Sequence, residues 1–174
     1  MIGHVALAVL FLAAWAPTAQ ADFSQEIRRC DFGGNHPDIR IVACTRNIQS
    51  GRFTGQNLAV AFTNRGLAHK SKGQWDRAIA DFSEAIRLKP GLAEAFGNRG
   101  NVYRKKGQFD RAIKDYDRAI HLKPDGAQVF ADRGLAYERK GEQNHALKDF
   151  KKAYALGYLH PLLLRKLRGA GPLP

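Results

Sequence analysis

Acidic side chains are scarce in this 174-residue chain, in which Asp and Glu total 16 against 28 Lys and Arg. The deficit is large between Arg139 and Pro174, where eight basic side chains face Glu142 and Asp149, a net charge of +6. Such a field attracts anionic partners and is screened by salt, but it does not specify the anion. The length leaves room for one compact unit or a short repeat array.

The chain also lacks an apolar run of the roughly 20 residues that a helix needs to cross a membrane. Its longest run extends from Val5 to Ala16 and is followed by Pro17 and an Ala-Gln-Ala triplet that ends at Ala21. Small residues in such a triplet suit a signal peptidase, although no Lys or Arg precedes the run. We therefore expect residues 1–21 to be a signal peptide cleaved after Ala21, and the mature protein to be periplasmic or secreted without a transmembrane anchor.

Cysteine is limited to Cys30 and Cys44. An oxidising compartment favours a disulfide between them, which would stabilise the fold by about 2 to 4 kcal/mol. A redox role is not expected, because the two positions are too far apart in the chain to form a Cys-x-x-Cys motif. A metal site with His36 as third ligand would lack a fourth ligand and a known spacing, so no metal is expected.

Catalytic patterns are missing as well. The chain has no nucleophile elbow, phosphate loop or metal-spaced His pair, and no carboxylate pair stands apart from the repeat described below. The sequence therefore predicts a protein that is not an enzyme and that needs no cofactor.

What the chain does contain is a repeat whose copies follow one another at a constant spacing and without a gap. The three copies begin at Ala59, Ala93 and Ala127 and read AVAFTNRGLAHKSKGQWDRAIADFSEAIRLKP, AEAFGNRGNVYRKKGQFDRAIKDYDRAIHLKP and AQVFADRGLAYERKGEQNHALKDFKKAYALGY. Self-similarity at such a fixed period is typical of solenoids built from repeated helical units.

Each copy carries the pattern of two antiparallel helices. In the first half, a large ring, a Gly and another ring fall at i, i+4 and i+7 on one helix face, and in the second half two Ala flank a ring. The first pattern is Phe62-Gly66-His69, Phe96-Gly100-Tyr103 and Phe130-Gly134-Tyr137, and the second is Ala78-Phe82-Ala85, Ala112-Tyr116-Ala119 and Ala146-Phe150-Ala153. We expect the second ring to fill the gap left by the Gly. His69 stands where the other copies have Tyr, which predicts a packing role.

Helix ends are marked in the same register. Gly73, Gly107 and Gly141 suit the left-handed cap of the first helix, and Pro90 and Pro124 end the second helix. Together these positions resemble the tetratricopeptide repeat, and the N-terminal segment resembles small exported bacterial repeat proteins that begin with two cysteines. The resemblance implies an all-α fold, a right-handed superhelical stack of antiparallel helix pairs.

The resemblance also predicts the domain organisation. Residues 22–58 are expected to form an N-terminal cap that contains the cysteines, residues 59–92, 93–126 and 127–160 the three repeats, and residues 161–174 a capping helix and tail. Asp38 and Cys44 align with Asp76 and Phe82, so the N-terminal cap is expected to contain a degenerate second helix. Leucines after Pro161 are expected to cover the other end of the stack.

In the family resembled, partners lie in a concave groove lined by the first helix of each repeat. An amide both donates and accepts hydrogen bonds, so two Asn one repeat apart could hold an extended peptide backbone, unless they simply tolerate a solvated face. The expected groove residues are Asn64, Asn98, Asn101, Lys70, Arg104, Lys105 and Arg139. The basic members suit an acidic partner. A carboxylate clamp is not expected, because Thr63 and Gly97 stand where it needs Lys.

A second recurring pair connects the two helices of each repeat. Arg65, Arg99 and Arg133 stand at one position of the first helix, and Asp81, Asp115 and Asp149 follow them at one position of the second helix. We expect a structural ion pair in every repeat, in preference to a ladder of ligand-binding arginines.

Two functions compete on these grounds. The favoured one is an interaction module that docks a segment of a partner protein in the groove, within the cell envelope. The alternative is a basic adaptor that binds an anionic polymer or a membrane surface through its C-terminal charge. Nucleic acid is disfavoured, because the leader predicts export and no platform of basic and stacking aromatic residues stands apart from the core rings.

Overall fold

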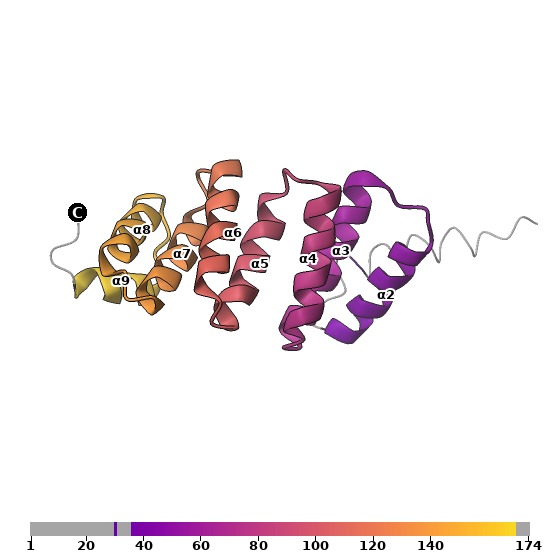
Figure 1. Ribbon diagram of the computed structural model, residues 1–174, viewed down its shortest axis with the longest axis horizontal. Helices are drawn as coiled ribbons and strands as arrows, with labels where there is room; N and C mark the ends of the chain where they lie inside the picture. The colour runs from indigo at the N-terminus through magenta and orange to yellow at the C-terminus, as the bar shows by residue number, and fades with distance from the viewer. Residues whose placement is uncertain (1–29, 31–35, 170–174) are drawn as a thin grey trace, which may run out of the picture.

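The computed structural model describes residue 30 and residues 36–169, and most of these residues lie in helices joined by short turns. In chain order the helices are α2 (Pro37–Gln49), α3 (Gly55–Ser71), α4 (Trp75–Leu88), α5 (Ala93–Lys105), α6 (Phe109–Leu122), α7 (Ala127–Arg139), α8 (Gln143–Ala155) and α9 (Pro161–Arg168). Each packs against the next, so the stack runs in chain order along the long axis of the molecule (Figure 1). The prediction of an all-α stack of helix pairs is confirmed.

The predicted leader, residues 1–21, lies outside the described residues. Within the described part, no helix is both long and apolar enough to cross a membrane.

The three predicted repeats are the pairs α3 and α4, α5 and α6, and α7 and α8. The first helix of each pair ends two residues before a glycine with a left-handed backbone, with φ of 70° at Gly73, 74° at Gly107 and 83° at Gly141. Helix α3 begins at Gly55, ahead of the expected repeat boundary at Ala59. No proline precedes it as Pro90 and Pro124 precede the later repeats, so the helix extends by one turn.

Contact between the helices of each pair depends on the expected glycine. A Cβ at Gly66 would lie 2.8 Å from the ring of Phe82, and one at Gly134 would lie 2.6 Å from the ring of Phe150. Phe82 is fully buried and Phe150 nearly so. The ring of the second helix therefore fills the space that the missing side chain leaves, as predicted.

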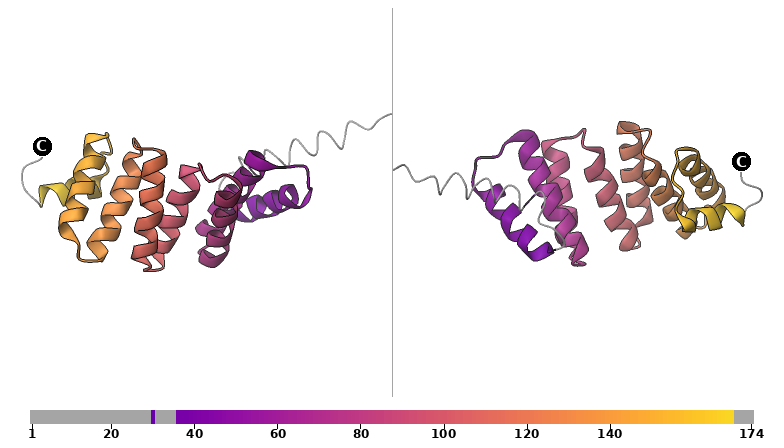
Figure 2. Two further views of the ribbon diagram at one scale, coloured as in Figure 1. Left: turned by 45° about the horizontal axis from the view of Figure 1, so that its top comes forward. Right: turned by 180° about the vertical axis from the view of Figure 1, so that it is seen from behind.

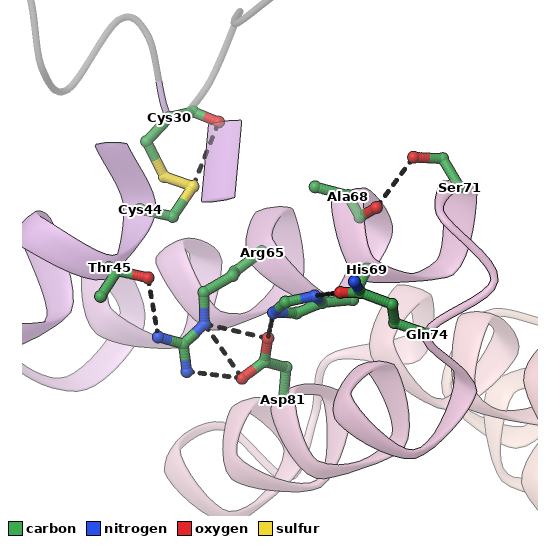
Figure 3. A network of polar contacts seen from close by, with 9 residues as sticks. All are labelled: Cys30, Cys44, Thr45, Arg65, Ala68, His69, Ser71, Gln74 and Asp81. Atoms are coloured by element: carbon green, nitrogen blue, oxygen red, sulfur yellow. Dashed lines mark hydrogen bonds and ion pairs between the residues drawn. A yellow bond between two sulfur atoms is a disulfide. The ribbon is translucent and has the colours of Figure 1, made fainter. Parts of the chain in front are cut away.

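Helix α2 takes the place of a second helix at the N-terminal end. Cys44 occupies the position of Phe82, and both Cys44 and its disulfide partner Cys30 are buried against Ala61 of α3. At this end of the stack the disulfide between Cys30 and Cys44 takes the place of the contact between a glycine and a ring that the repeats use (Figure 3). The expected disulfide is present, and the position of Cys44 supports the expected alignment of α2 with a second helix.

Helix α9 closes the other end of the stack. Leu163 and Leu167 are buried in the same cluster as Phe130 and Phe150, while Leu162 and Leu164 are half-buried. Arg168 stands one repeat length after Gly134, where a further helix pair would need a glycine. A second helix could not pack on α9 as Phe150 packs at Gly134, which supports the prediction that α9 is a cap. Figure 2 shows α9 lying across the end of the α7 and α8 pair.

Candidate partner-binding groove

The recurring arginines form partly buried ion pairs between the two helices of each repeat. Arg65, Arg99 and Arg133 contact Asp81, Asp115 and Asp149 of their own repeat at 2.7, 2.8 and 2.7 Å. The three aspartate side chains are 4 to 9% exposed, so they are shielded from solvent by the stack. The hydrogen bond with Asp115 is the main factor that raises the pKa of Arg99. The predicted structural ion pair is confirmed in all three repeats.

Each arginine also reaches back to the preceding repeat, a contact that the sequence analysis missed. Arg65 donates to Thr45 at 3.1 Å, Arg99 to Ser83 at 2.9 Å and Arg133 to Asp117 at 2.6 Å. Thr45 belongs to α2, which again shows that α2 acts as a second helix (Figure 3). The arginines therefore link each repeat to the one before it and are not available as a ladder of ligand-binding groups.

His69 packs inside the first repeat, as expected. It is 7% exposed, and its Nδ1 lies 2.6 Å from Oε1 of Gln74 in the turn between α3 and α4 (Figure 3). This contact ties the end of α3 to the start of α4.

A different ladder runs over the first helices. Helices α3 and α5 contact each other directly, and so do α5 and α7. Lys70 donates to Asn98 at 2.8 Å and Arg104 to Asp132 at 3.2 Å, and Lys166 of α9 pairs with Glu138. The first two contacts run from the last turn of one first helix to the middle of the next. We call this set the groove ladder.

Tyr116 connects the groove ladder to the core. Its ring fills the space at Gly100, and it is the one ring of the three equivalent positions that carries a hydroxyl, since the others are Phe82 and Phe150. The hydroxyl donates to Oδ1 of Asn101 at 2.8 Å and accepts from Nε of Arg104 at 3.3 Å. Burial raises the pKa of Tyr116, so the hydroxyl stays protonated and can donate.

Beside this network lies a cavity of about 480 Å³ between α5, α7 and the turn that precedes α7. Its lining comprises Ala93, Glu94, Gly97, Asn98, Asn101, Tyr116, Ala119, Lys123, Asp125, Gly126, Ala127, Gln128, Val129 and Asp132. At Gly97 the helix has no side chain, and a Cβ there would lie 3.8 Å from Val129, an ordinary contact distance. Gly97 is buried, so helix backbone without a side chain forms this part of the cavity wall.

Charges beside the cavity are largely compensated. Burial raises the pKa of Asp132, although Arg104 and Lys70 act in the opposite direction. Burial lowers the pKa of Lys70, against the attraction of Asp132 and Glu94. Lys70 and Arg104 are thus held by groups of the protein itself, and the wall of the cavity offers amides and backbone beside the charged residues of its lining.

The predicted groove residues divide into three groups. Asn98 and Asn101 line the cavity, and Lys70 and Arg104 contact them from behind. Asn64 is half-buried on α3 and is not part of the lining, and Lys105 is exposed at the end of α5. Arg139 lies 6.0 Å from the ring centre of Phe109 on α6, so it stacks on a second helix.

Several lining residues were not predicted as site residues, among them Glu94, Gln128 and Asp132. Asp132 could have been found, because it stands one repeat after Asn98 and occupies the same position in its helix. Among the described residues, those of the cavity included, no group of three His, Cys, Asp or Glu side chains could hold a metal ion.

Two family models match this chain, and both describe the same repeat. A family model described as "TPR repeat" matches residues 66–107 and 100–141, and one described as "Tetratricopeptide repeat" matches residues 127–156. Together these matches cover more than half of the chain. No curated protein sequence matches it significantly.

Solved structures similar to this chain include MamA and peptide-bound domains. A crystal structure of MamA is 28% identical, with a TM-score of 0.71, and the match covers 80% of this chain and 82% of that one. The second TPR domain of human RPAP3, in complex with the HSP70 peptide SGPTIEEVD, is 27% identical, with a TM-score of 0.61 and coverage of 66% and 95%. The second TPR of Spaghetti (RPAP3), bound to an HSP90 peptide, is 29% identical, with a TM-score of 0.56 and coverage of 64% and 98%.

Proposed function

The chain belongs to the tetratricopeptide repeat family, and from this premise we propose that it is a non-catalytic interaction module that docks an extended segment of a partner protein. The docking site is the cavity between α5 and α7, on the face where the first helices contact one another. The amide of Asn98 carries the proposal, because it lies in the lining of this cavity. Structurally similar domains of human RPAP3 and Spaghetti are bound to peptides, which supports this use of the fold.

Asn98 is the residue best placed to hold the partner. Its Oδ1 accepts from Lys70, and its amide nitrogen has no hydrogen-bond partner among the described residues. That nitrogen can donate to a carbonyl of an extended peptide without reading its sequence. Gln128 is exposed on the facing helix and offers a second amide.

The charge of the cavity bears on the partner. Glu94, Asp125 and Asp132 lie in the lining with one basic residue, Lys123. This composition supports recognition of the partner's backbone over capture of a C-terminal carboxylate. Lys105 is exposed in the last turn of α5, outside the lining, and would form an ion pair with an acidic side chain of the partner.

We place this function in the cell envelope, as a periplasmic or secreted protein. The leader predicted at residues 1–21 supports this location. So does the disulfide between Cys30 and Cys44, because such bonds persist in oxidising compartments.

Site-specific photo-crosslinking tests the proposal. A photoreactive amino acid at Gln128, on the rim of the cavity, is compared with one at Ala80, which is exposed on α4, in an envelope extract. We expect a discrete protein adduct from position 128 that is absent from position 80 and is lost when Gly97→Leu fills the cavity. Equal adducts from both positions, or an adduct that survives Gly97→Leu, would contradict groove docking.

A further inference from the structure

The second helices α6 and α8 carry exposed cations on their outer surface. These are Lys114 and Arg118 on α6 and Lys148, Lys151 and Lys152 on α8, which we call the outer basic face. Lys148 falls one repeat after Lys114, and Lys152 falls one repeat after Arg118. Two cations therefore recur at equivalent positions in neighbouring repeats. The equivalent residues of α4 are Ala80 and Glu84, so the face begins at α6.

Nearby carboxylates do not neutralise this face, because they are already engaged. Asp117 and Asp149 both contact Arg133, and Asp110 and Glu142 both contact Lys140. The five cations of the outer basic face have no ion pair among the described residues. They form an uncompensated positive surface that attracts anions.

A furrow lies at the α8 part of this face, between α7 and α8. Its volume is about 550 Å³, and it is lined by Phe130, Arg133, Lys148, Asp149, Lys151, Lys152 and Ala155. Lys148, Lys151 and Lys152 fall at i, i+3 and i+4, so all three lie on the same side of α8. A furrow walled by lysines suits a narrow, chain-like anion better than a flat surface with the same charges would.

The residues around the furrow distinguish among anionic partners. The large apolar side chains exposed in the described part, Ile39, Val42, Val60 and Leu159, all lie outside α6 and α8, so this face offers none to insert into a bilayer. Within the described residues, neither α6 nor α8 exposes a Phe, Tyr or Trp ring on which a nucleobase could stack. Lysine ammonium groups are compact, strongly hydrated point charges, which suit carboxylates spaced along a hydrated polymer.

We propose that the outer basic face binds an acidic polysaccharide, a chain of sugars that carry uronate groups. The face lies on the second helices, whereas the docking cavity is lined mainly by first helices. The protein can therefore hold a polymer with one surface while the groove remains open to a protein partner. This inference does not depend on groove docking.

Binding of oligogalacturonate of defined length to the full mature chain tests the inference. The variant Lys148→Gln/Lys151→Gln/Lys152→Gln is compared with Arg77→Gln/Lys89→Gln/Arg165→Gln, which has the same net charge but leaves the face intact. We expect the first variant to bind about tenfold more weakly than the wild type, the loss that three exposed ion pairs give, and the second to bind like the wild type. Binding of the wild type should also weaken as salt rises from about 50 to about 200 mM.

Circular dichroism melting confirms that both variants are folded. Equal weakening in the two variants would mean that net charge alone attracts the polymer, which contradicts a defined face. Tighter binding of single-stranded DNA or of phosphatidylglycerol vesicles, lost in the lysine variant, would overturn the assignment to a polysaccharide.

Discussion

Lys70 on α3 donates a hydrogen bond to Asn98 on α5 across 2.8 Å. The same positions carry Arg104 and Asp132 one repeat later, and Glu138 and Lys166 at the end of the stack. The first helices are therefore joined to one another by polar contacts along the groove. Arg65, Arg99 and Arg133 join them to the second helices. This arrangement orients Asn98 at the wall of the cavity, next to Gly97, which has no side chain.

Gly97 and Gly100 of α5 should respond differently to the same substitution. A Cβ at Gly100 would lie 2.8 Å from the ring of Tyr116, whereas one at Gly97 meets only Val129 at 3.8 Å. We expect Gly100→Ala to lower the free energy of unfolding by about 1 to 3 kcal/mol through overpacking. Gly97→Ala should be neutral or raise it by up to about 1 kcal/mol, because Ala favours a helix. Urea titration of both variants measures the difference, and equal losses would contradict the packing described.

The buried ion pairs should matter more to stability than the exposed ones. Asp115→Ala leaves Arg99, whose side chain is 19% exposed, with Ser83 alone as a hydrogen-bond acceptor. Loss of one partner from a fully buried pair costs about 3 to 5 kcal/mol, so partial exposure makes about 2 kcal/mol our expectation. Asp76→Ala removes a pair with Lys106 in which the aspartate is 86% exposed, and it should leave the thermal midpoint nearly unchanged. Equal shifts of the two midpoints would show that burial does not decide the effect.

Removal of the disulfide should act mainly on one end of the stack. Cys30 and Cys44 close a loop with a sequence separation of 14, and the bond is worth about 3 kcal/mol. In a solenoid each unit contacts only its neighbours, so Cys30→Ala/Cys44→Ala should speed amide hydrogen exchange in α2 and α3 more than in α7 and α8. Uniformly faster exchange along the whole chain would contradict a local cap.

Asp132 should give the stability of the protein a pH dependence. Burial raises its folded pKa, so the folded state holds the proton more tightly than the unfolded state. The contribution of this group is then full below its unfolded pKa and is lost as the pH rises through its folded pKa. We expect the stability of Asp132→Asn relative to the wild type to increase with pH across that interval, measured by urea titration at several pH values. A relative stability that falls as the pH rises would mean that the folded pKa is lowered.

The fold could be predicted from the sequence because its contacts use the same residue types at the same place in each copy. Gly66 with Phe82 and Arg65 with Asp81 have counterparts in both later copies, so one copy predicts the others. Even Cys44 could be placed, because the surrounding residues kept the register of a second helix.

The groove was less predictable, because its contacts do not repeat in kind. The groove ladder joins Lys with Asn, then Arg with Asp, then Glu with Lys. At each of the two repeat positions the residue type therefore differs from copy to copy, and the charge is not the same in all three. The prediction of a basic rim was therefore incomplete: Lys70 and Arg104 are turned to partners within the protein. The role of Asn101 depends on the hydroxyl of Tyr116, which a pattern of large rings does not distinguish from Phe.

The central claim is that a partner docks in the cavity beside α5, and the most direct test is the affinity of the captured partner segment for Gly97→Leu, which adds a side chain to the lining. Gly97→Ala serves as the control, because its Cβ is accommodated at an ordinary contact distance. We predict that Gly97→Leu remains folded by circular dichroism and binds the segment at least about tenfold more weakly than Gly97→Ala, a difference of about 1.4 kcal/mol. Equal affinity of the two variants would contradict the account and place the binding site elsewhere on the protein.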